Sequence, residues 1–243
     1  MEFFVYGSIQ GPKAVQTALS EITGYAPIPS YNSLGFHFCK WEWNSAQMLI
    51  DRSDNFTATG FPVDVLWSDI EYAQDLEYFV FNETTFPQVT VNKLNQVIQK
   101  AGRRLVIITD PHISEDKTGY AVYDNGQALN AASAGGSNVT NVWVLQPNGV
   151  DNFVGQCWPG PSVWVDYINE NAQNYWSSLY LTQNFNGQTY LWGAWNDMNE
   201  PSVFIDSSTH ELEQRGMPVH NIHVAVDGKQ FLHMYIHNAY GGL

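Results

Sequence analysis

The sequence is poor in cysteine, in positive charge and in long apolar runs. It has only 2 cysteines, Cys39 and Cys157, which are too few for a disulfide scaffold and lack the paired spacing of a zinc site. We expect both to be buried free thiols, and we expect no metal site. No run approaches the length of a membrane-spanning helix. The start M-E-F-F-V-Y-G lacks the basic and apolar regions of a signal peptide.

Basic residues are outnumbered by acidic ones. The chain has 10 Lys and Arg against 24 Asp and Glu, a formal net charge of −14. Such a surface repels nucleic acid and anionic lipid, so neither is an expected partner. Aromatic residues are abundant, with 9 Trp and 13 Tyr, and they suit stacking against sugar rings as well as core packing.

Apolar periodicity predicts an α/β chain. A first strand is expected at residues 2–8, followed by a helix from Pro12 to Ile22 and a linker at Pro27 and Pro29. Four more strands are then predicted at 34–38, 62–67, 105–109 and 190–195, with helices at 46–53, 90–101 and 162–181. Alternation of strands and helices implies parallel strands.

The pattern breaks between Asp110 and Pro161, in a stretch rich in Gly, Asn, Ser and Ala. This stretch is too long for an ordinary connection inside a compact domain. We therefore expect an inserted, functional loop after the third parallel strand, at about residues 111–161.

Three aspartates close successive predicted strands. Asp69 follows the strand expected at 62–67, Asp110 the strand at 105–109 and Asp197 the strand at 190–195. In a parallel barrel these strand ends open on one face, so the three side chains are expected to converge on one pocket. The alternative for each aspartate is a turn or a helix cap.

The segment Ala194–Phe204, A-W-N-D-M-N-E-P-S-V-F, closely resembles the W-x-D-M-N-E signature of glycoside hydrolase family 31. Further segments resemble this family in the same order along nearly the whole chain: L-G-F-H-F-C-K-W, F-P-V-D-V-L-W-S-D-I-E-Y, L-V-I-I-T-D-P-H-I, G-Q-C-W-P-G and H-N-A-Y-G. The resemblance implies about four βα units, the first half of a TIM (β/α)8 barrel, at residues 31–243. Residues 1–30 would be the end of a preceding β-domain and a linker helix.

The resemblance also implies a site for a terminal glucose. Asp197 would be the catalytic nucleophile, and Glu200 an orienting partner, with a second catalytic role for Glu200 as the alternative. The residues that would bind the sugar are Asp69, Ile70, Ile108, Asp110, Trp158, Trp195 and Met198. Asp69 would accept hydrogen bonds from hydroxyl groups, and Asp110 would support the pocket. For Trp158 the alternative is a buried aromatic in a turn.

The implied activity is retaining hydrolysis of α-linked glucose from oligosaccharides or N-glycans, without a metal or organic cofactor. The segments most resemble the branch of the family that acts in the endoplasmic reticulum with a regulatory β subunit. Lys40 stands where the family usually has Arg, and Leu232-His233-Met234 where it has Glu-His-Arg. Sequons at Asn55, Asn82 and Asn138 would matter only in the secretory lumen; chance explains them equally well.

No W-T-G-D-N-type segment, which carries the acid/base aspartate of the family, occurs in the sequence. We therefore expect this chain to be a fragment of a longer enzyme. Two alternatives remain open: a truncated, inactive half-barrel, and a family member that acts on α-xylosides or on maltosides.

Overall fold

The computed structural model describes residues 3–132, 139–190, 192–206 and 216–243. The chain divides into two units, Met1–Gly35 and Phe36–Leu243. The first unit contains helix α1 (Pro12–Thr23), as expected, which begins at a proline and ends before Gly24. The strand expected at residues 2–8 is wrong, since residues 3–8 form none and no described strand pairs with them.

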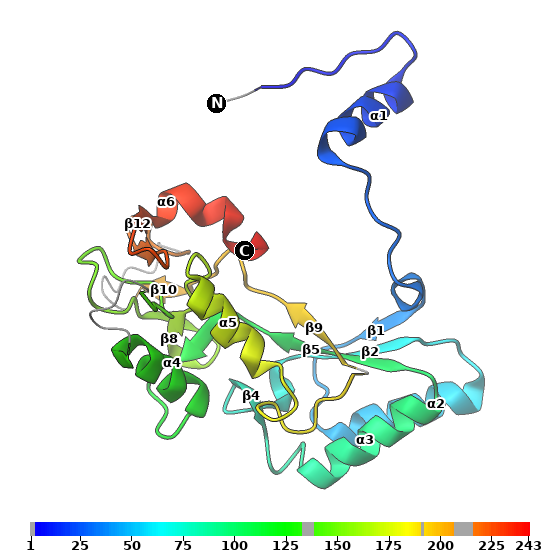
Figure 1. Cartoon of the computed structure of the whole chain (residues 1–243). Helices are drawn as coiled ribbons and strands as arrows, with labels where there is room; N and C mark the ends of the chain where they lie inside the picture. Colours follow the sequence, from blue (N-terminus) through cyan, green and yellow to red (C-terminus); the bar gives the residue numbers. More distant parts are fainter. Residues whose placement is uncertain (1–2, 133–138, 191, 207–215) are drawn as a thin grey trace. The chain divides into compact units, whose positions relative to one another are not determined.

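The second unit is built on a four-stranded sheet in the order β1-β2-β5-β9. The strands are β1 (His37–Cys39), β2 (Val65–Ser68), β5 (Arg104–Thr109) and β9 (Trp192–Asn196). All three pairings are parallel, and Figure 1 shows the strands side by side. The predicted parallel α/β architecture is confirmed, with strand ends within three residues of their expected positions.

Helices α2 (Ala46–Thr59) and α3 (Gln88–Lys100) connect the first three of these strands and lie along one side of the sheet (Figure 1). The α2 helix begins after Ser45, whose hydroxyl accepts a hydrogen bond from the backbone N–H of Met48. It ends at Gly60, in the left-handed conformation, and is thus longer than expected.

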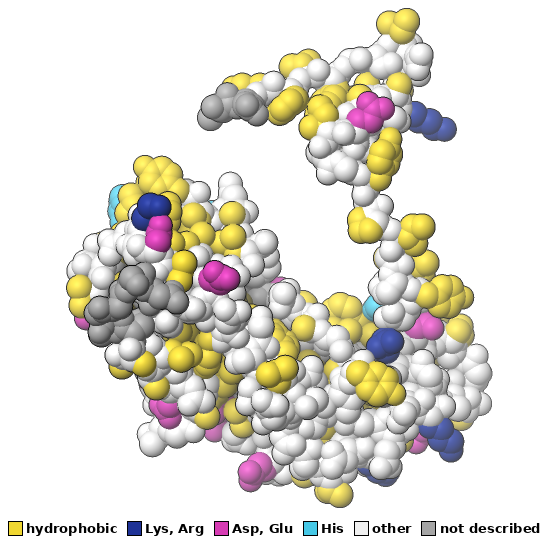
Figure 2. All heavy atoms as spheres, viewed as in Figure 1, with side chains coloured by type: hydrophobic (Ala, Val, Ile, Leu, Met, Phe, Trp, Pro, Cys, Tyr) yellow, Lys and Arg dark blue, Asp and Glu magenta, His cyan; other side chains and the backbone are white. Residues whose placement is uncertain are grey.

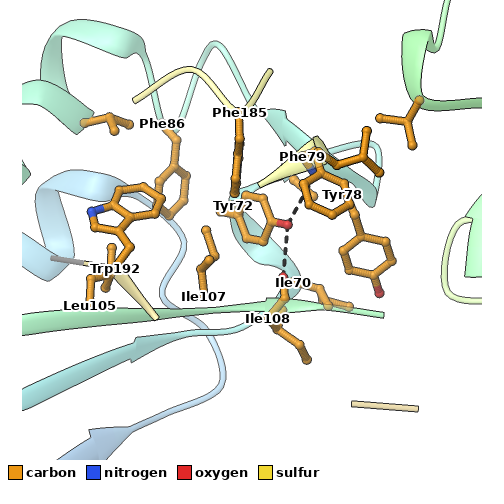
Figure 3. Packing of buried hydrophobic residues seen from close by; sticks show 14 of the residues in the cluster. Ile70, Tyr72, Tyr78, Phe79, Phe86, Leu105, Ile107, Ile108, Phe185 and Trp192 are labelled. Carbon is orange, nitrogen blue, oxygen red and sulfur yellow. Dashed lines mark hydrogen bonds between the residues drawn. The ribbon is translucent and has the colours of Figure 1, made fainter. Parts of the chain in front are cut away.

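An aromatic cluster fixes a small hairpin onto the end of β5 (Figure 3). The hairpin consists of β3 (Ala73–Gln74) and β4 (Glu77–Phe81), and it follows the 3-10 helix η2 (Ile70–Tyr72). The Tyr72 hydroxyl donates to the Ile108 carbonyl at 3.0 Å and accepts the Phe79 N–H at 3.4 Å. These bonds hold β4 beside the carboxyl end of β5.

The segment after β5 is not the irregular loop that we expected. It contains β6 (His112–Ser114), α4 (Ala121–Ala132), β7 (Gly155–Cys157) and β8 (Gly160–Trp164). With β10 (Ile205–Asp206) the strands form an antiparallel sheet in the order β10-β7-β8-β6. Apolar residues in the described part of this segment, such as Trp143 and Val144, are fully buried, and their burial stabilises these elements.

The helix expected at residues 162–181 is correct only in its second part. Residues Ser162–Trp164 belong to β8 and pair with β6. Helix α5 (Glu170–Leu179) begins after Asn169, whose side chain accepts the Asn171 N–H. Aromatic spacing alone did not separate the strand from the helix.

The C-terminal part consists of β11 (Ile222–Val224), β12 (Gln230–Leu232), α6 (His233–Ile236) and the 3-10 helix η3 (His237–Gly242). Three histidines that are scattered in the sequence are joined there by hydrogen bonds. His223 Nε2 lies 2.9 Å from His233 Nδ1, and His233 Nε2 lies 2.9 Å from His237 Nδ1. The other ring nitrogen of His223, Nδ1, lies 2.7 Å from Asp166 Oδ1, so Asp166 ends this series of hydrogen bonds.

The two cysteines differ from each other. Cys157 is buried, as expected, and burial raises the pKa of its thiol to about 12. Cys39 is exposed, so the expectation of burial was wrong there. It is the last residue of β1, a strand without a buried residue.

Basic side chains are sparse on the face in Figure 2. Among the described residues, no helix has the length and apolar character that crossing a bilayer requires. Of the sequons, Asn55 lies exposed in α2 and the Asn82 side chain accepts two backbone N–H groups. Asn138 lies outside the described residues.

Candidate active site

Three carboxylates meet at the carboxyl ends of neighbouring parallel strands. Asp69 follows β2, Asp110 follows β5 and Asp197 follows β9. The register places Ser68 beside Ile107 and Thr109 beside Asn196, so each aspartate comes directly after a paired strand end. The charge of Asp197 contributes to raising the pKa of both other carboxyls, which puts the three groups within electrostatic reach.

Asp110 is the most buried of the three, with no exposed surface. Its Oδ2 accepts a hydrogen bond from the Tyr78 hydroxyl, and its Oδ1 has no partner among the described atoms. Burial raises the pKa of Asp110 to about 7, and the charges of Asp197, Asp69 and Glu200 act in the same direction. The hydrogen bond from Tyr78 opposes this rise. A buried acceptor without a partner is a candidate ligand contact.

Asp69 has two roles in the geometry. Its Oδ1 accepts the backbone N–H of Ile70 at 2.8 Å and caps η2, so the cap alternative is correct for this oxygen. Burial raises the pKa of the carboxyl, and the charges of Glu71 and Asp197 add to the shift. The protonation of Asp69 therefore depends on the charge of its acidic neighbours, Asp197 among them.

The residue after Asp197 adopts an unusual backbone conformation. Met198 has φ 57°, in the left-handed region of backbone conformation. Residues other than glycine adopt this conformation at a cost of roughly 1 kcal/mol or more. Its carbonyl accepts the Ser202 N–H at 3.0 Å, and the chain then joins β7 through the Phe204 N–H and the Gln156 carbonyl. The turn thus leads from the end of β9 to the β7–β8 hairpin.

The two candidate tryptophans lie on different elements. Trp195, in β9, is half-buried and contacts Trp67 edge to face, with ring centroids 5.4 Å apart. Trp158, in the turn between β7 and β8, is 42% exposed and contacts Phe204 at 4.8 Å. Its exposure contradicts the alternative of an ordinary buried aromatic.

The remaining candidates are placed as follows. Ile70 is buried in η2 next to Asp69, and Ile108 is buried on the face of β5 opposite to Ile107 (Figure 3). Glu200 is exposed, yet its charge raises the pKa of Asp110 and of Cys157. All the sequence-derived candidates therefore belong to strand ends, or to turns that follow them.

A cavity of about 230 Å³ lies between α5 and the strand ends. Its wall includes Thr109 and Asn196, the residues that precede two of the carboxylates, together with Trp176 and Tyr240. None of the three carboxylates lines this cavity. It is thus a neighbour of the candidate site and not the site itself.

Sequence reasoning missed two residues of this site, Tyr78 and His112. Tyr78 reaches Asp110 from β4, and His112 Nε2 lies 3.7 Å from Asp110 Oδ2. The turn before β4, Asp75-Leu76, has positive φ at both residues without a glycine, so no usual turn signal marks the hairpin. The only local signal for His112 was its position two residues after Asp110.

The carboxyl ends of parallel strands are where TIM-barrel enzymes place their active sites. Residues 26–243 match the model of the glycosyl hydrolases family 31 TIM-barrel domain. The chain belongs to this family.

Its relatives are α-glucosidases. The chain is 36% identical over 233 residues to glucosidase 2 subunit alpha of Schizosaccharomyces pombe, a match that covers 95% of the chain and 22% of the relative. A crystal structure of glucosidase II alpha subunit bound to DNJ has a TM-score of 0.79 at 31% identity, covering 95% of the chain and 22% of that structure. The catalytic subunit in a heterodimeric ER glucosidase II complex has a TM-score of 0.76 at 32% identity, covering 90% and 21%. The chain thus spans about a fifth of the length of these relatives.

Proposed function

We propose that this chain forms part of a retaining α-glucosidase in which Asp197 is the nucleophile. The observation that carries the proposal is the meeting of Asp69, Asp110 and Asp197 at adjacent strand ends in a family 31 barrel domain. The four parallel strands would be the first half of the barrel, and residues 111–161 an insertion after its third strand. The remaining strands would come from a part of the protein outside this sequence.

The reaction would be a double displacement. Asp197 attacks the anomeric carbon of a terminal α-glucoside, while a carboxylic acid from outside this sequence protonates the leaving oxygen. Water, deprotonated by that same group, then attacks the glucosyl-enzyme and releases glucose with its configuration retained. The negative charge near Asp69 and Asp110 would favour the positive charge that develops on the sugar in the transition state.

The other residues would bind the sugar. Asp69 and Asp110 would accept hydrogen bonds from hydroxyl groups, and Glu200 would orient the Asp197 turn. Apolar contacts with the ring would come from Ile70, Ile108, Trp158, Trp195 and Met198. No step of this mechanism requires a metal or an organic cofactor.

The substrate and partner are proposed from the relatives. Glucosidase II structures include a form bound to alpha3-Glc2 and a complex with the binding domain of the regulatory subunit. We therefore propose an α-glucosylated oligosaccharide or N-glycan as substrate, a glucosidase II regulatory β subunit as partner and the lumen of the endoplasmic reticulum as location.

The test uses the longer protein whose reading frame contains this chain. We expect hydrolysis of p-nitrophenyl α-D-glucopyranoside, slower hydrolysis of the α-xyloside, and α-glucose as the first product in an NMR time course. Asp197→Ala should lower kcat by at least about 10⁴-fold, because it removes the covalent step.

The matched control is Asp124→Ala, which removes an exposed carboxylate in α4 and should leave kcat unchanged. Full activity of Asp197→Ala would overturn the nucleophile. A preference for the α-xyloside would overturn the glucosidase assignment in favour of an α-xylosidase. A folded but inert longer protein would overturn the enzymatic reading.

A further inference from the structure

Asp110 uses only one of its two oxygens within the described structure. Its Oδ2 accepts the Tyr78 hydroxyl, whereas Oδ1 is buried without a partner. A buried carboxylate oxygen without a donor is costly, unless a ligand supplies the donor. The Asp110 side chain is therefore held at one oxygen and available at the other.

Tyr78 is itself held firmly in place. Its backbone carbonyl accepts the hydroxyl of Tyr120 at 2.9 Å, and the next residue, Phe79, is bonded through its N–H to Tyr72. Figure 3 shows the Tyr78 hydroxyl turned away from the aromatic cluster that anchors the hairpin. The direction of the Tyr78 hydroxyl is thus set by packing that does not involve Asp110.

His112 approaches the same hydroxyl from β6. Its Nε2 lies 3.4 Å from the Tyr78 oxygen, and the two rings meet edge to face with centroids 5.4 Å apart. Burial lowers the pKa of His112 to about 3, so the imidazole is neutral and carries one proton. An Nε2–H donated to the Tyr78 oxygen leaves the single Tyr78 proton for the carboxylate.

We propose that Tyr78 and His112 are positioning residues that fix Asp110 Oδ2 and leave Oδ1 as the acceptor for a hydroxyl of the glucoside. The inference rests on the proposed function. The three residues come from β4, β6 and the end of β5, so the hairpin and the segment after β5 jointly orient one side chain of the candidate site.

The charges around Asp110 determine how its ionisation responds to a mutation. Carboxylates act on it from the ends of the other strands, namely Asp69, Asp197 and Glu200. Neutral titratable groups also lie near it: Tyr72, Tyr78, His112, Cys157, Tyr167 and Tyr180. Among these influences the hydrogen bond from Tyr78 favours the carboxylate, whereas burial and the three acidic neighbours oppose it.

The test is Tyr78→Phe in the longer protein. Loss of the bond should raise the pKa of Asp110 further, so the acid limb of the pH profile of kcat/KM should move to higher pH. Affinity for an iminosugar such as 1-deoxynojirimycin should fall by about 10- to 100-fold, the usual effect of losing one hydrogen bond to a charged group. The control Tyr175→Phe removes a buried hydroxyl that donates to Val122, away from Asp110, and should move neither quantity.

A double-mutant cycle separates positioning from general structural support. In an Asp110→Ala background, which removes the acceptor, Tyr78→Phe should have almost no additional effect on inhibitor affinity, because Tyr78 acts through Asp110. His112→Phe keeps the ring and removes the donor, so it should move the acid limb in the same direction by a smaller amount. This variant carries the test if Tyr78→Phe does not fold.

Each result decides between the claims. Additive losses in the cycle, or an unchanged acid limb in folded Tyr78→Phe, would overturn the positioning role while leaving the glucosidase function intact. A wild-type protein that neither hydrolyses the glucoside nor binds the iminosugar would overturn both.

Discussion

Asp110 is held in a site that disfavours its charged form. The side chain is fully buried, and three acidic neighbours raise its pKa together with the loss of solvent. Burying a carboxylate in this way costs stability at neutral pH. Such a cost is expected where a group is retained for binding or catalysis.

Asp110→Asn should therefore stabilise the fold at high pH while it impairs activity. The pKa is raised in the folded state, so this state binds the proton more tightly, and stability falls as pH rises from about 4 to about 7. The asparagine side chain does not ionise, so the variant does not lose stability as the pH rises. Its free energy of unfolding at pH 8 should exceed that of the wild type by on the order of 2–4 kcal/mol.

The measurement is urea unfolding at pH 4.5 and pH 8. The gain should be large at pH 8 and small at pH 4.5, and the exposed substitution Asp124→Asn should give no gain at either pH. A variant that is less stable than wild type at pH 8 would contradict this account of Asp110.

At the residue scale, the sequence predicted the positions of the three strand-end aspartates correctly. It did so because side chains at the ends of parallel strands depend on strand order alone. The contacts of Tyr78 with Asp110 and His112 depend on how a hairpin and a second sheet fold back over β5. Separations of 32 residues and more between such partners leave no periodic signal in the sequence.

At the element scale, the hydrogen-bonded chain Asp166–His223–His233–His237 connects β11 and α6 to the segment before α5. The three distances fit an arrangement in which each imidazole donates from Nδ1 and Asp166 is the last acceptor. Burial, followed by the neighbouring His223 and His237, lowers the pKa of His233 to about 3. Protonation of His233 is thus incompatible with this packing.

The His chain should make the fold sensitive to acid. In the unfolded state His233 is protonated below about pH 6.5, whereas in the folded state its pKa is about 3. The contribution of His233 to the free energy of unfolding is therefore fully present above pH 6.5 and is lost as the pH falls below it. In His233→Gln the pH dependence of the unfolding free energy between pH 6 and 4 should be weaker by about 1.4 kcal/mol per pH unit.

Urea titrations at half-unit pH steps measure this slope. The exposed His220→Gln is the matched control and should keep the wild-type slope. Equal slopes for wild type and His233→Gln would show that His233 is not excluded from protonation. His112 should add to the slope of the wild type, because burial lowers its pKa in the same way, whereas Asp110, whose pKa is raised, should oppose it.

Prediction of the elements succeeded where the pattern was local. The parallel strands have apolar runs, so their ends were predicted within three residues, and the ends of helices α1 and α3 within two. The small strands β6, β7 and β8 have only three to five residues each and are ordered by tertiary burial. Their Gly- and Asn-rich surroundings predicted a loop, which burial of Trp143 and its neighbours overrides.

At the scale of the whole molecule, the edge strand β9 is only partly covered. In β9, Trp192 is buried whereas Gly193, Ala194 and Asn196 are exposed. This strand leads to Asp197 and pairs on one side with β5. The proposed remainder of the barrel would pair with its other side and bring the acid/base group to the same pocket.

The most direct test of the account is covalent labelling of the longer protein with 5-fluoro-α-D-glucopyranosyl fluoride, which slows release of a glycosyl-enzyme. After peptic digestion, mass spectrometry should place a single fluoroglucosyl group on Asp197, and pretreatment with an iminosugar should prevent the labelling. A label on any other carboxylate, or rapid hydrolysis of glucosides by Asp197→Ala, would contradict the account.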